Sequence, residues 1–474
     1  MSPTKASRPG DKTLSALERA LGLFTEVRAG EGATGLCMLI GVFLVLAAYY
    51  FVKPARDGLL AISPAGGLSE TELKAYSSFA QSLCLLAALP VYDRVSKMLE
   101  RRTLVTAVTL FFSANLVVFW ALQPGLLFAD VSYAGLVFYL WVGIFNVFIV
   151  AQFWAFAADL YPEETGKRLF PLIAIGATAG AASGAWMAKR LVGPFGTYGL
   201  LLIAAAVLSL SLFAMRQADS LGAEGKGSRE GRLHDAHDGE PLRDAAGGLS
   251  LIFRHKYLMA TAVLVLVLNW VNSNGENFLF GALEKHIHAQ ALAQGLAPGA
   301  ASEAFIRDQT TRFYGDLFFW VNLTALFLQA VVASRLLRYG GFGAILLALP
   351  LVSFTAYVAM ALHPGLGTIR RMKIAENGTD YSLNNTAKQV LWLPTTVDMK
   401  YRAKASIDTL FVRAGDGLAA LTAFVGVKLL EAPLRALFGF NAALVLVWLA
   451  VGAIIIAEHA RLSSQLRSRR ATAA

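Results

Sequence analysis

Seven side chains able to bind a charged solute follow one face of a helix predicted over residues 367–393. At 100° per residue they fall within an arc of about 100°. They comprise three cations, one carboxylate, a phenol and two amides: Arg370, Lys373, Asn377, Asp380, Tyr381, Asn384 and Lys388. Ionisable groups at membrane depth cost about 2.5–3.5 kcal/mol each, so this stripe needs partner charges or a bound solute. The alternative is a surface helix outside the membrane, with the stripe merely solvated.

A second cluster lies near the end of the first apolar run, in the sequence Tyr49-Tyr50-Phe-Val-Lys53-Pro54-Ala-Arg56-Asp57. Lys53 and Arg56 share a helical face with Tyr49, and Asp57 lies at the edge of that face. We expect Pro54 to kink or loosen the helix. In the other interpretation the first span ends at Val52, and these charges lie at the membrane interface.

Further polar faces occur on two more predicted spans, and a third holds a possible ion pair. A helix over 257–282 places four side chains on one face: Asn269, Ser273, Glu276 and Phe280. A helix over 134–158 adds Asn146 and Gln152, for which hydrogen bonds between helices explain as much as substrate contact does. At the start of a span over 404–427, Lys404 and Asp408 are four residues apart and can pair. We assign substrate binding to the seven residues of the stripe and to Lys53, Arg56 and Asp57. We assign coupling or gating to Glu276, Lys404 and Asp408.

The elements that must position these residues follow from composition. The chain has 474 residues, of which 56% are hydrophobic and 16% charged, and the apolar residues form blocks long enough for a helix to cross a bilayer. We predict an all-α membrane protein with twelve transmembrane helices in two six-helix halves. The predicted spans are 34–62, 74–92, 103–121, 134–158, 169–188, 196–215, 257–282, 312–333, 343–362, 367–393, 404–427 and 437–458.

Between the two halves lies a polar, glycine-rich segment that predicts a flexible cytoplasmic linker at 216–256. The halves then occupy 34–215 and 257–458, with tails at 1–33 and 459–474. Lys and Arg concentrate in the tails and in the 2–3 and 4–5 loops, which places both termini in the cytoplasm of a multi-pass inner-membrane protein. This bias explains the net charge of +10 without nucleic acid as a partner. Residues 285–312 predict a long outer loop, and Cys37 and Cys84 lie in apolar blocks as small core residues.

The layout of six spans, an inner linker and six more spans resembles that of major facilitators, in which spans 1, 4, 7 and 10 line a central cavity between two rocking halves. The polar faces fall on those four spans, and their cations outnumber their carboxylates. Such a cavity suits an anionic small molecule. The sequence has no phosphate-binding loop, zinc spacing or nucleophile elbow, so we expect a non-enzyme without cofactor, metal or catalytic residues. We expect a monomer in the lipid bilayer.

Several motifs resemble the ATP/ADP translocase family of plastids and intracellular bacteria. They run in the expected order from span 1 to span 11: Lys53-Pro-Ala-Arg56-Asp57, Phe153-Trp154-Ala-Phe156-Ala-Ala-Asp159, Gly166-Lys167-Arg168-Leu-Phe170-Pro171, Lys373-Ile-Ala-Glu376-Asn-Gly-Thr-Asp380-Tyr381, and Lys400-Tyr-Arg402-Ala-Lys404-Ala-Ser-Ile407-Asp408. The resemblance implies roles for Lys53, Arg56, Asp57, Lys404 and Asp408. The sequence departs from the family pattern because span 4 holds no acid and Glu276 has no nearby basic residue before Lys285.

Three functions remain open: two kinds of transporter and a protein that does not transport. The resemblance implies a divergent bacterial nucleotide exchanger that moves ATP, ADP or related nucleoside phosphates by alternating access. The alternative is a proton-coupled permease for another anionic solute, with Glu276 or Asp380 as the proton site. A membrane scaffold or lipid-handling protein is the third, although a scaffold does not need charges on four cavity helices.

Overall fold

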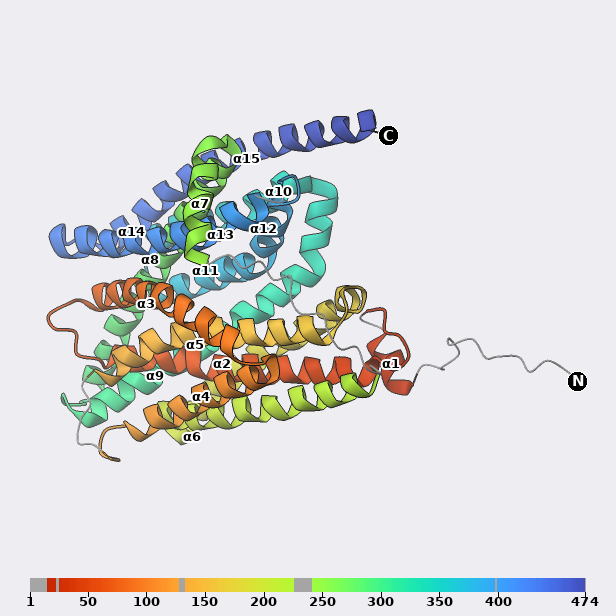
Figure 1. The fold of residues 1–474 in the computed structure, drawn as a ribbon. Coiled ribbons are helices and arrows are strands. Elements are labelled where there is room, and N and C mark those ends of the chain that lie inside the picture. Colours follow the sequence, from red (N-terminus) through yellow and green to blue (C-terminus); the bar gives the residue numbers. More distant parts are fainter. Residues whose placement is uncertain (1–14, 23–24, 128–132, 226–240, 397–398, 474) are drawn as a thin grey trace, which may run out of the picture.

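The computed structural model describes residues 15–22, 25–127, 133–225, 241–396 and 399–473, and these residues form helices joined by short connections without any strand. Figure 1 shows two helical bundles lying side by side, one from each half of the chain. The first half begins with a short helix and continues with five longer ones: α1 (Ala16–Leu21), α2 (Gly32–Ala61), α3 (Glu70–Met98), α4 (Arg101–Ala121), α5 (Ala134–Leu160) and α6 (Glu163–Gly225).

The second half contains several helices interrupted by π-helical turns, which are labelled η. They are α7 (Pro241–Arg254), α8 (Lys256–Ala293), α9 (Ala300–Phe327), η1 (Leu328–Ala333), α10 (Ser334–Leu362), α11 (Leu366–Thr379), η2 (Asp380–Asn384), α12 (Asn385–Leu391), η3 (Met399–Ala403), α13 (Lys404–Ser406), η4 (Ile407–Phe411), α14 (Val412–Ala423), η5 (Phe424–Leu429) and α15 (Leu434–Ala473). The run from η3 to η5 is one continuous crossing, as are α11, η2 and α12.

Two glycines allow single long helical segments to cross twice. Gly196 in α6 has φ 67° and ψ 172°, and Gly341 in α10 has φ 67° and ψ −166°. Only glycine adopts such a left-handed conformation without strain, so the chain reverses direction at both positions. Among the described residues nine helices are long and apolar enough to span a membrane, and two of these, of 58 and 63 residues, contain two crossings each.

The polar segment 366–391, which comprises α11, η2 and α12, is the remaining crossing. It packs against α9 and α10, and its Lys373 side chain is fully buried, which excludes a solvated surface helix. The predicted all-α architecture of twelve spans in two six-helix halves is therefore confirmed. The interpretation in which the first span ends at Val52 is wrong, because α2 remains helical through Pro54 and the charged cluster as far as Ala61.

A stripe of glycines on α6 brings this helix against α2. A Cβ atom at Gly180 would overlap the carbonyl oxygen of Phe43, and one at Gly184 would lie 2.5 Å from the carbonyl oxygen of Ala47. Gly176 approaches Leu39 in the same way, at 2.6 Å. Small residues spaced four apart allow such close packing of helix backbones.

Two connecting segments differ from the sequence-based expectations. Within the predicted linker at 216–256, α6 continues to Gly225 and residues 241–254 form α7, while 226–240 lie outside the described residues. Gly248 of α7 packs directly on the backbone of Arg402 and on Ser406. The long outer loop predicted at 285–312 is wrong, because α8 extends to Ala293 and α9 begins at Ala300. Helix-favouring Ala, Glu and Gln continue both helices beyond their apolar parts.

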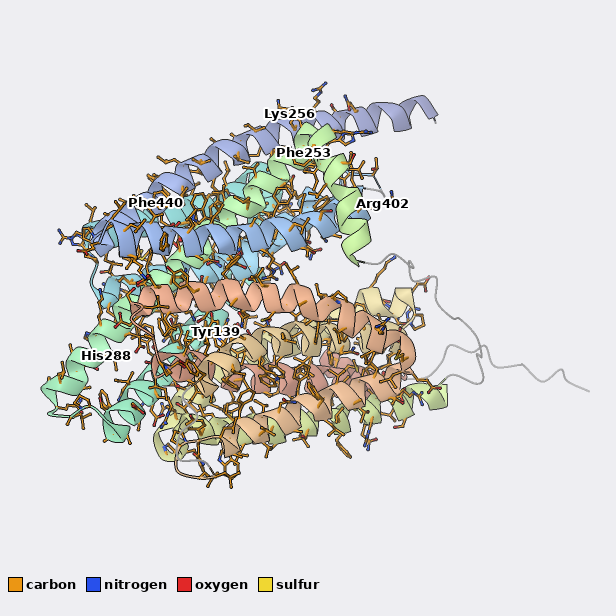
Figure 2. The ribbon with its side chains drawn as sticks, turned by 60° about the vertical axis from the view of Figure 1, so that its left-hand side comes forward. Tyr139, Phe253, Lys256, His288, Arg402 and Phe440 are labelled. Atoms are coloured by element: carbon orange, nitrogen blue, oxygen red, sulfur yellow. The ribbon has the colours of Figure 1, made fainter. Side chains whose placement is uncertain are left out.

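The two ends of the molecule differ in how the halves meet. The first described helix, α1, and the last turns of α15 lie at one end, which we call the terminal end, and the ribbons of the two halves diverge toward it (Figure 1). We call the opposite end the closed end, because the halves touch there: a Cβ at Gly58 would meet the carbonyl oxygen of Arg307 at 2.6 Å. Thr197 also donates a hydrogen bond to Asp308 over 2.8 Å. Figure 2 shows α8 running from Lys256 toward the terminal end to His288 at the closed end.

Candidate functional site

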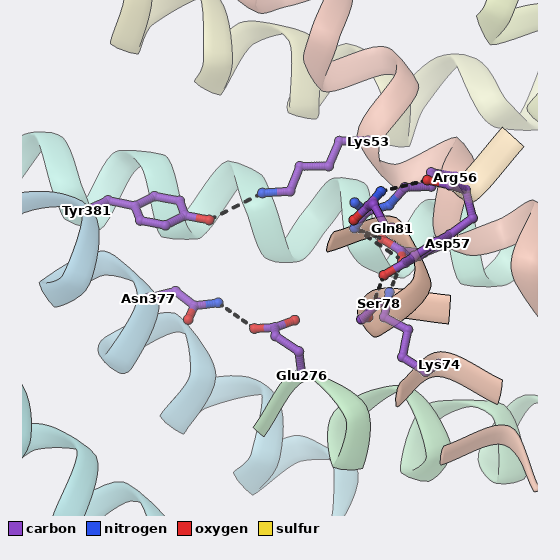
Figure 3. Close-up of polar contacts among 10 residues, drawn as sticks. Lys53, Arg56, Asp57, Lys74, Ser78, Gln81, Glu276, Asn377 and Tyr381 are labelled. Carbon is purple, nitrogen blue, oxygen red and sulfur yellow. Dashed lines mark hydrogen bonds and ion pairs between the residues drawn. The ribbon is translucent and has the colours of Figure 1, made fainter. Parts of the chain in front are cut away.

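The charged cluster on α2 is a buried network of three residues. The Arg56 guanidinium lies 3.3 Å from the Asp57 carboxylate, and Lys74 of α3 makes an ion pair with the same carboxylate. Both cations also face the ring of Tyr139 from α5, each at 4.6 Å from its centroid. Figure 3 shows Arg56 and Lys74 converging on Asp57. The charges of Arg56 and Lys74 are therefore shared with Asp57, which leaves less of them for a substrate.

A second network holds the lysine at the centre of the predicted stripe. Lys373 has no exposed surface and lies 2.7 Å from Glu376 and 3.1 Å from Glu276 of α8. Tyr357 of α10 donates a hydrogen bond to Glu376 over 3.1 Å, and Asn377 donates one to Glu276 over 2.9 Å. Glu276 therefore has a basic partner, contributed by a distant part of the sequence. Lys373 is neutralised by two carboxylates and is not free to bind an anion.

The third network connects the two halves. Asp316 of α9 lies 2.5 Å from Lys189 of α6, and its other carboxylate oxygen makes an ion pair with Arg370 of α11. Lys189 belongs to the first half, whereas Asp316 and Arg370 belong to the second. The Asp316 carboxylate thus joins a cation from each half, and Arg370 is paired with it rather than free to bind an anion.

A fourth network centres on Asp416 of α14, which contacts the polar face predicted on α8. Asn269 and Ser273 donate hydrogen bonds to Asp416 of α14 over 2.7 Å and 2.8 Å. Ser82 of α3 donates to the other oxygen of Asp416, which Arg413 approaches within 3.3 Å. These contacts consume the polar groups of Asn269 and Ser273, and they hold α3 of the first half against α14 of the second.

Lys53 differs from the other cations near the centre. Its ammonium donates a hydrogen bond to the Tyr381 hydroxyl over 3.2 Å, and Figure 3 shows it reaching across between the halves. Among the described residues no carboxylate lies within 4 Å of this ammonium. Aromatic rings surround it instead, at centroid distances of 3.9 Å, 5.3 Å, 5.6 Å and 5.9 Å for Phe318, Tyr50, Tyr381 and Tyr49.

The side chains of the predicted stripe on α11, η2 and α12 do not all face the boundary between the halves. Tyr381 turns to Lys53, whereas Asp380 accepts a hydrogen bond from Asn384 over 2.6 Å and lines a small cavity inside the second half. The π-helical turn η2 inserts an extra residue per turn, so the regular spacing of an α-helix does not hold there. Asp380 and Tyr381, which lie at the two edges of the predicted arc, therefore face different surroundings.

Lys388, Lys404 and Asp408 come together in a cavity of about 340 Å³ nearer the terminal end. It lies between α8 and the two crossings that contain α12 and α14. Its wall also includes the polar and aromatic residues Asn269, Asn385, Gln389 and Trp392. The structure thus brings one predicted binding residue together with two predicted gating residues.

Gln152 on α5 does not line this cavity. Its amide donates a hydrogen bond to the Tyr92 hydroxyl of α3, which is the bond between helices that the sequence suggested as one of two explanations.

Sequence reasoning missed several partners of the predicted site: Lys74, Lys189, Asp316, Glu376 and Asp416. Asp316 lies inside the predicted span 312–333, so the rule for ionisable groups at membrane depth identifies it. Lys74 and Lys189 lie at or just beyond the ends of predicted spans, where a cation is ordinarily explained by the membrane interface. Their pairing with Asp57 and Asp316 follows from tertiary packing alone.

We compared the chain with known protein families, curated sequences and solved structures. Neither a scan of protein-family models nor a search of curated protein sequences found a match. Among solved structures, the nucleoside transporter NupG has a TM-score of 0.58 at 14% identity over 89% of this chain and 99% of its own. A bacterial homologue of the iron transporter ferroportin in an inward-facing state has a TM-score of 0.59 at 12% identity, covering 89% and 98%.

A POT family transporter in complex with 5-aminolevulinic acid has a TM-score of 0.58 at 13% identity over 90% of this chain and 96% of its own. The chain has the major facilitator fold. Its structural neighbours are secondary transporters of this type. The helices of this chain are likewise those of a multi-pass membrane protein. Identities this low establish the fold and leave the substrate open, so the resemblance to ATP/ADP translocases remains a hypothesis.

Proposed function

We propose that this protein is a secondary transporter that exchanges nucleotides, such as ATP and ADP, across the membrane through a site centred on Lys53. The observation that carries the proposal is the position of Lys53, a cation without a carboxylate partner among the described residues, between the two halves. The other central cations, Arg56, Arg370 and Lys373, are each paired with carboxylates. At the centre of the molecule, an anion would therefore meet Lys53 as a positive charge that no carboxylate neutralises.

The aromatic rings around Lys53 support a substrate that has both a ring and a negative charge. Phe318, Tyr50, Tyr381 and Tyr49 offer faces or edges on which a nucleobase can stack. The stacking of a base on an aromatic side chain contributes about 1–3 kcal/mol. A phosphate would replace part of the contact between Lys53 and these rings with a charge-assisted hydrogen bond.

The lone charge also favours exchange over one-way transport. When the halves close around an empty site, Lys53 would be enclosed without a counter-charge, and burial of an unpaired ion is costly. A bound anion supplies the counter-charge and lowers that cost. Reorientation of the loaded carrier is then faster than that of the empty carrier, which couples outward movement of one anion to inward movement of another.

The cavity with Lys388, Lys404 and Asp408 fits the approach route for such a substrate. It lies on the terminal-end side of the bundle, whereas the closed end seals the opposite side. With both termini in the cytoplasm, as the basic loops predict, the structure represents a state that is closed outside and accessible from the cytoplasm. Lys388 and Lys404 would attract an anion before it reaches Lys53.

The proton-coupled permease remains the second candidate, and one observation favours it. Asp380 accepts a hydrogen bond from Asn384 and has no cation within 4 Å among the described residues, so no ion pair engages its carboxyl group. Glu276 is less suited, because it is already engaged by Lys373 and Asn377.

Uptake by proteoliposomes that contain the purified protein separates the two candidates. We expect labelled ATP to enter vesicles preloaded with ADP far faster than empty vesicles, and a protonophore to leave this exchange unchanged. Uptake of ATP that requires a proton gradient would favour the permease. Absence of ATP uptake under both conditions would contradict a nucleotide transporter.

A further inference from the structure

A buried carboxyl at the closed end has no part in the site described above. Glu284 of α8 has no exposed surface. One of its oxygens accepts a hydrogen bond from the Thr310 hydroxyl of α9 over 2.7 Å, and Thr310 is itself fully buried. The other oxygen, Oε2, is buried and has no hydrogen-bond partner in the described part of the chain.

The charged and titratable groups around Glu284 do not neutralise it. Glu70 of α3 and Asp57 of α2 are carboxylates, and Lys74 of α3 is already paired with Asp57. Tyr314 of α9 has a buried hydroxyl without a partner, and on α8 itself a His288 ring nitrogen lies 2.8 Å from the backbone carbonyl of Glu284. In the described part of the chain no Lys or Arg comes within 4 Å of the Glu284 carboxyl.

This environment disfavours a carboxylate ion. A buried charge without a cation loses its hydration and gains little in return, so such a group is stable as the neutral acid. The neutral acid still accepts the Thr310 hydrogen bond. It also avoids repulsion from the neighbouring carboxylates of Glu70 and Asp57.

Glu284 is buried by the same contacts that close this end of the molecule. One helical turn earlier, Gly281 packs against Thr71 of α3, which belongs to the other half. Beside Thr310, the Thr311 hydroxyl lies 2.8 Å from the Thr197 hydroxyl of α6 and contacts Gly58 of α2. Separation of the halves at this end would remove these contacts and admit water to the carboxyl.

We propose that Glu284 is a proton-binding site of the closed end, protonated while α3, α8 and α9 pack together and ionised when the halves separate there. On opening, the O–H bond of the Glu284 carboxyl breaks and the proton passes to water. On closing, the carboxylate takes a proton back. Opening therefore releases a proton and becomes easier as the pH rises, whatever substrate the central site accepts.

The test follows the closed end directly, without substrate. Spin labels are placed on cysteines introduced at the exposed positions Phe195, in the first half, and Gln294, in the second, after Cys37 and Cys84 are replaced by serine. The full chain is reconstituted in lipid vesicles, and the distance between labels is measured from low to high pH. We expect the wild type to shift from a short to a longer distance as the pH rises.

Three variants identify the titrating group. Glu284→Gln, which mimics the neutral acid, should keep the short distance at every pH, and Glu303→Gln, at an exposed position near the start of α9, should behave as the wild type. Thr310→Val removes the donor to the carboxylate and should raise the midpoint by about half to one pH unit. This shift provides the test if Glu284→Gln does not fold.

The measurements leave clear ways to overturn the proposal. A wild-type distance that does not change with pH would overturn it, as would a Glu284→Gln protein that opens with the wild-type pH profile. An unchanged midpoint in Thr310→Val would also count against it. Because no nucleotide is present, none of these results depends on the proposed transport function.

Discussion

The ammonium of Lys53 lies 3.2 Å from the hydroxyl of Tyr381, and this hydrogen bond joins α2 of the first half to η2 of the second. The contact is formed between groups that can separate at little cost, since neither is locked in an ion pair among the described residues. A substrate that binds Lys53 therefore competes with Tyr381 and alters a contact between the halves. This relationship links binding to the movement of the halves in our account.

Replacement of Lys373 by Met should destabilise the protein by about 3–5 kcal/mol, because Glu276 and Glu376 would remain buried without their shared cation. Thermal unfolding in detergent measures the effect. The double variant Lys373→Met with Glu376→Gln should lose less, since it leaves one buried carboxylate fewer. Lys285→Met, at an exposed position on α8, is the control and should unfold as the wild type. Equal unfolding of the Lys373 and Lys285 variants would show that the buried network is not formed.

The bridge at Asp316 should stabilise the closed end through its contact with Lys189. Lys189→Met removes the contact between halves, and since its side chain is 40% exposed we expect a loss of about 1 kcal/mol, or about fivefold in the ratio of closed to open molecules. Distances between labels at positions 195 and 294 report this ratio. Arg370→Met breaks the pair within the second half and should open the closed end less. The bridge would not be a contact between halves in solution if the two variants opened it equally.

Glu31 at the start of α2 should make stability depend on pH in acid. Burial opposes its charge, but two hydrogen bonds from Arg168, of 2.7 Å and 2.8 Å, and the backbone N–H of Arg28 outweigh this and hold the pKa of Glu31 below its usual range. A lowered pKa stabilises the folded state fully above the ordinary glutamate pKa of about 4.3, and this contribution is lost as the pH falls through the lower folded value.

Melting temperatures from pH 7 to pH 3 test this effect. The difference between the wild type and Glu31→Gln should be largest near neutral pH and should shrink below about pH 4.3. Glu26→Gln is the matched control, because the Glu26 side chain is exposed and pairs only weakly with Arg28 at 3.7 Å. A difference for Glu31→Gln that is the same at pH 3 and pH 7 would rule out the linkage.

Much of the fold could be predicted from the sequence because it depends on local properties. Apolar blocks of sufficient length define most spans, and the spacing of Gly176, Gly180 and Gly184 predicts close helix packing. The placement of Lys53 and Arg56 on one face of α2 could also be predicted, from the helical period. The helices at 285–293 and 300–312 could not be predicted in this way, because they continue in polar residues and hydropathy does not mark their ends.

The pairing of the charges could not be predicted in the same way. Lys373 meets Glu276 and Lys189 meets Asp316 only because distant helices pack together. The turn η2 also changes the register of the second half of the predicted stripe, so Asp380 and Tyr381 face different surroundings. The sequence suggested a strongly cationic cavity, whereas the structure neutralises most of those cations and leaves Lys53 as the central exception.

Equilibrium binding of ATP to the purified protein, compared between the wild type and Lys53→Gln, tests the central claim most directly. A lost charge-assisted contact is worth about 1.5–3 kcal/mol, so the variant should bind ATP about tenfold to more than a hundredfold more weakly. Lys428→Gln, at an exposed position in η5, should bind as the wild type. Wild-type affinity in Lys53→Gln, or no binding of ATP by the wild type, would contradict a nucleotide site centred on Lys53.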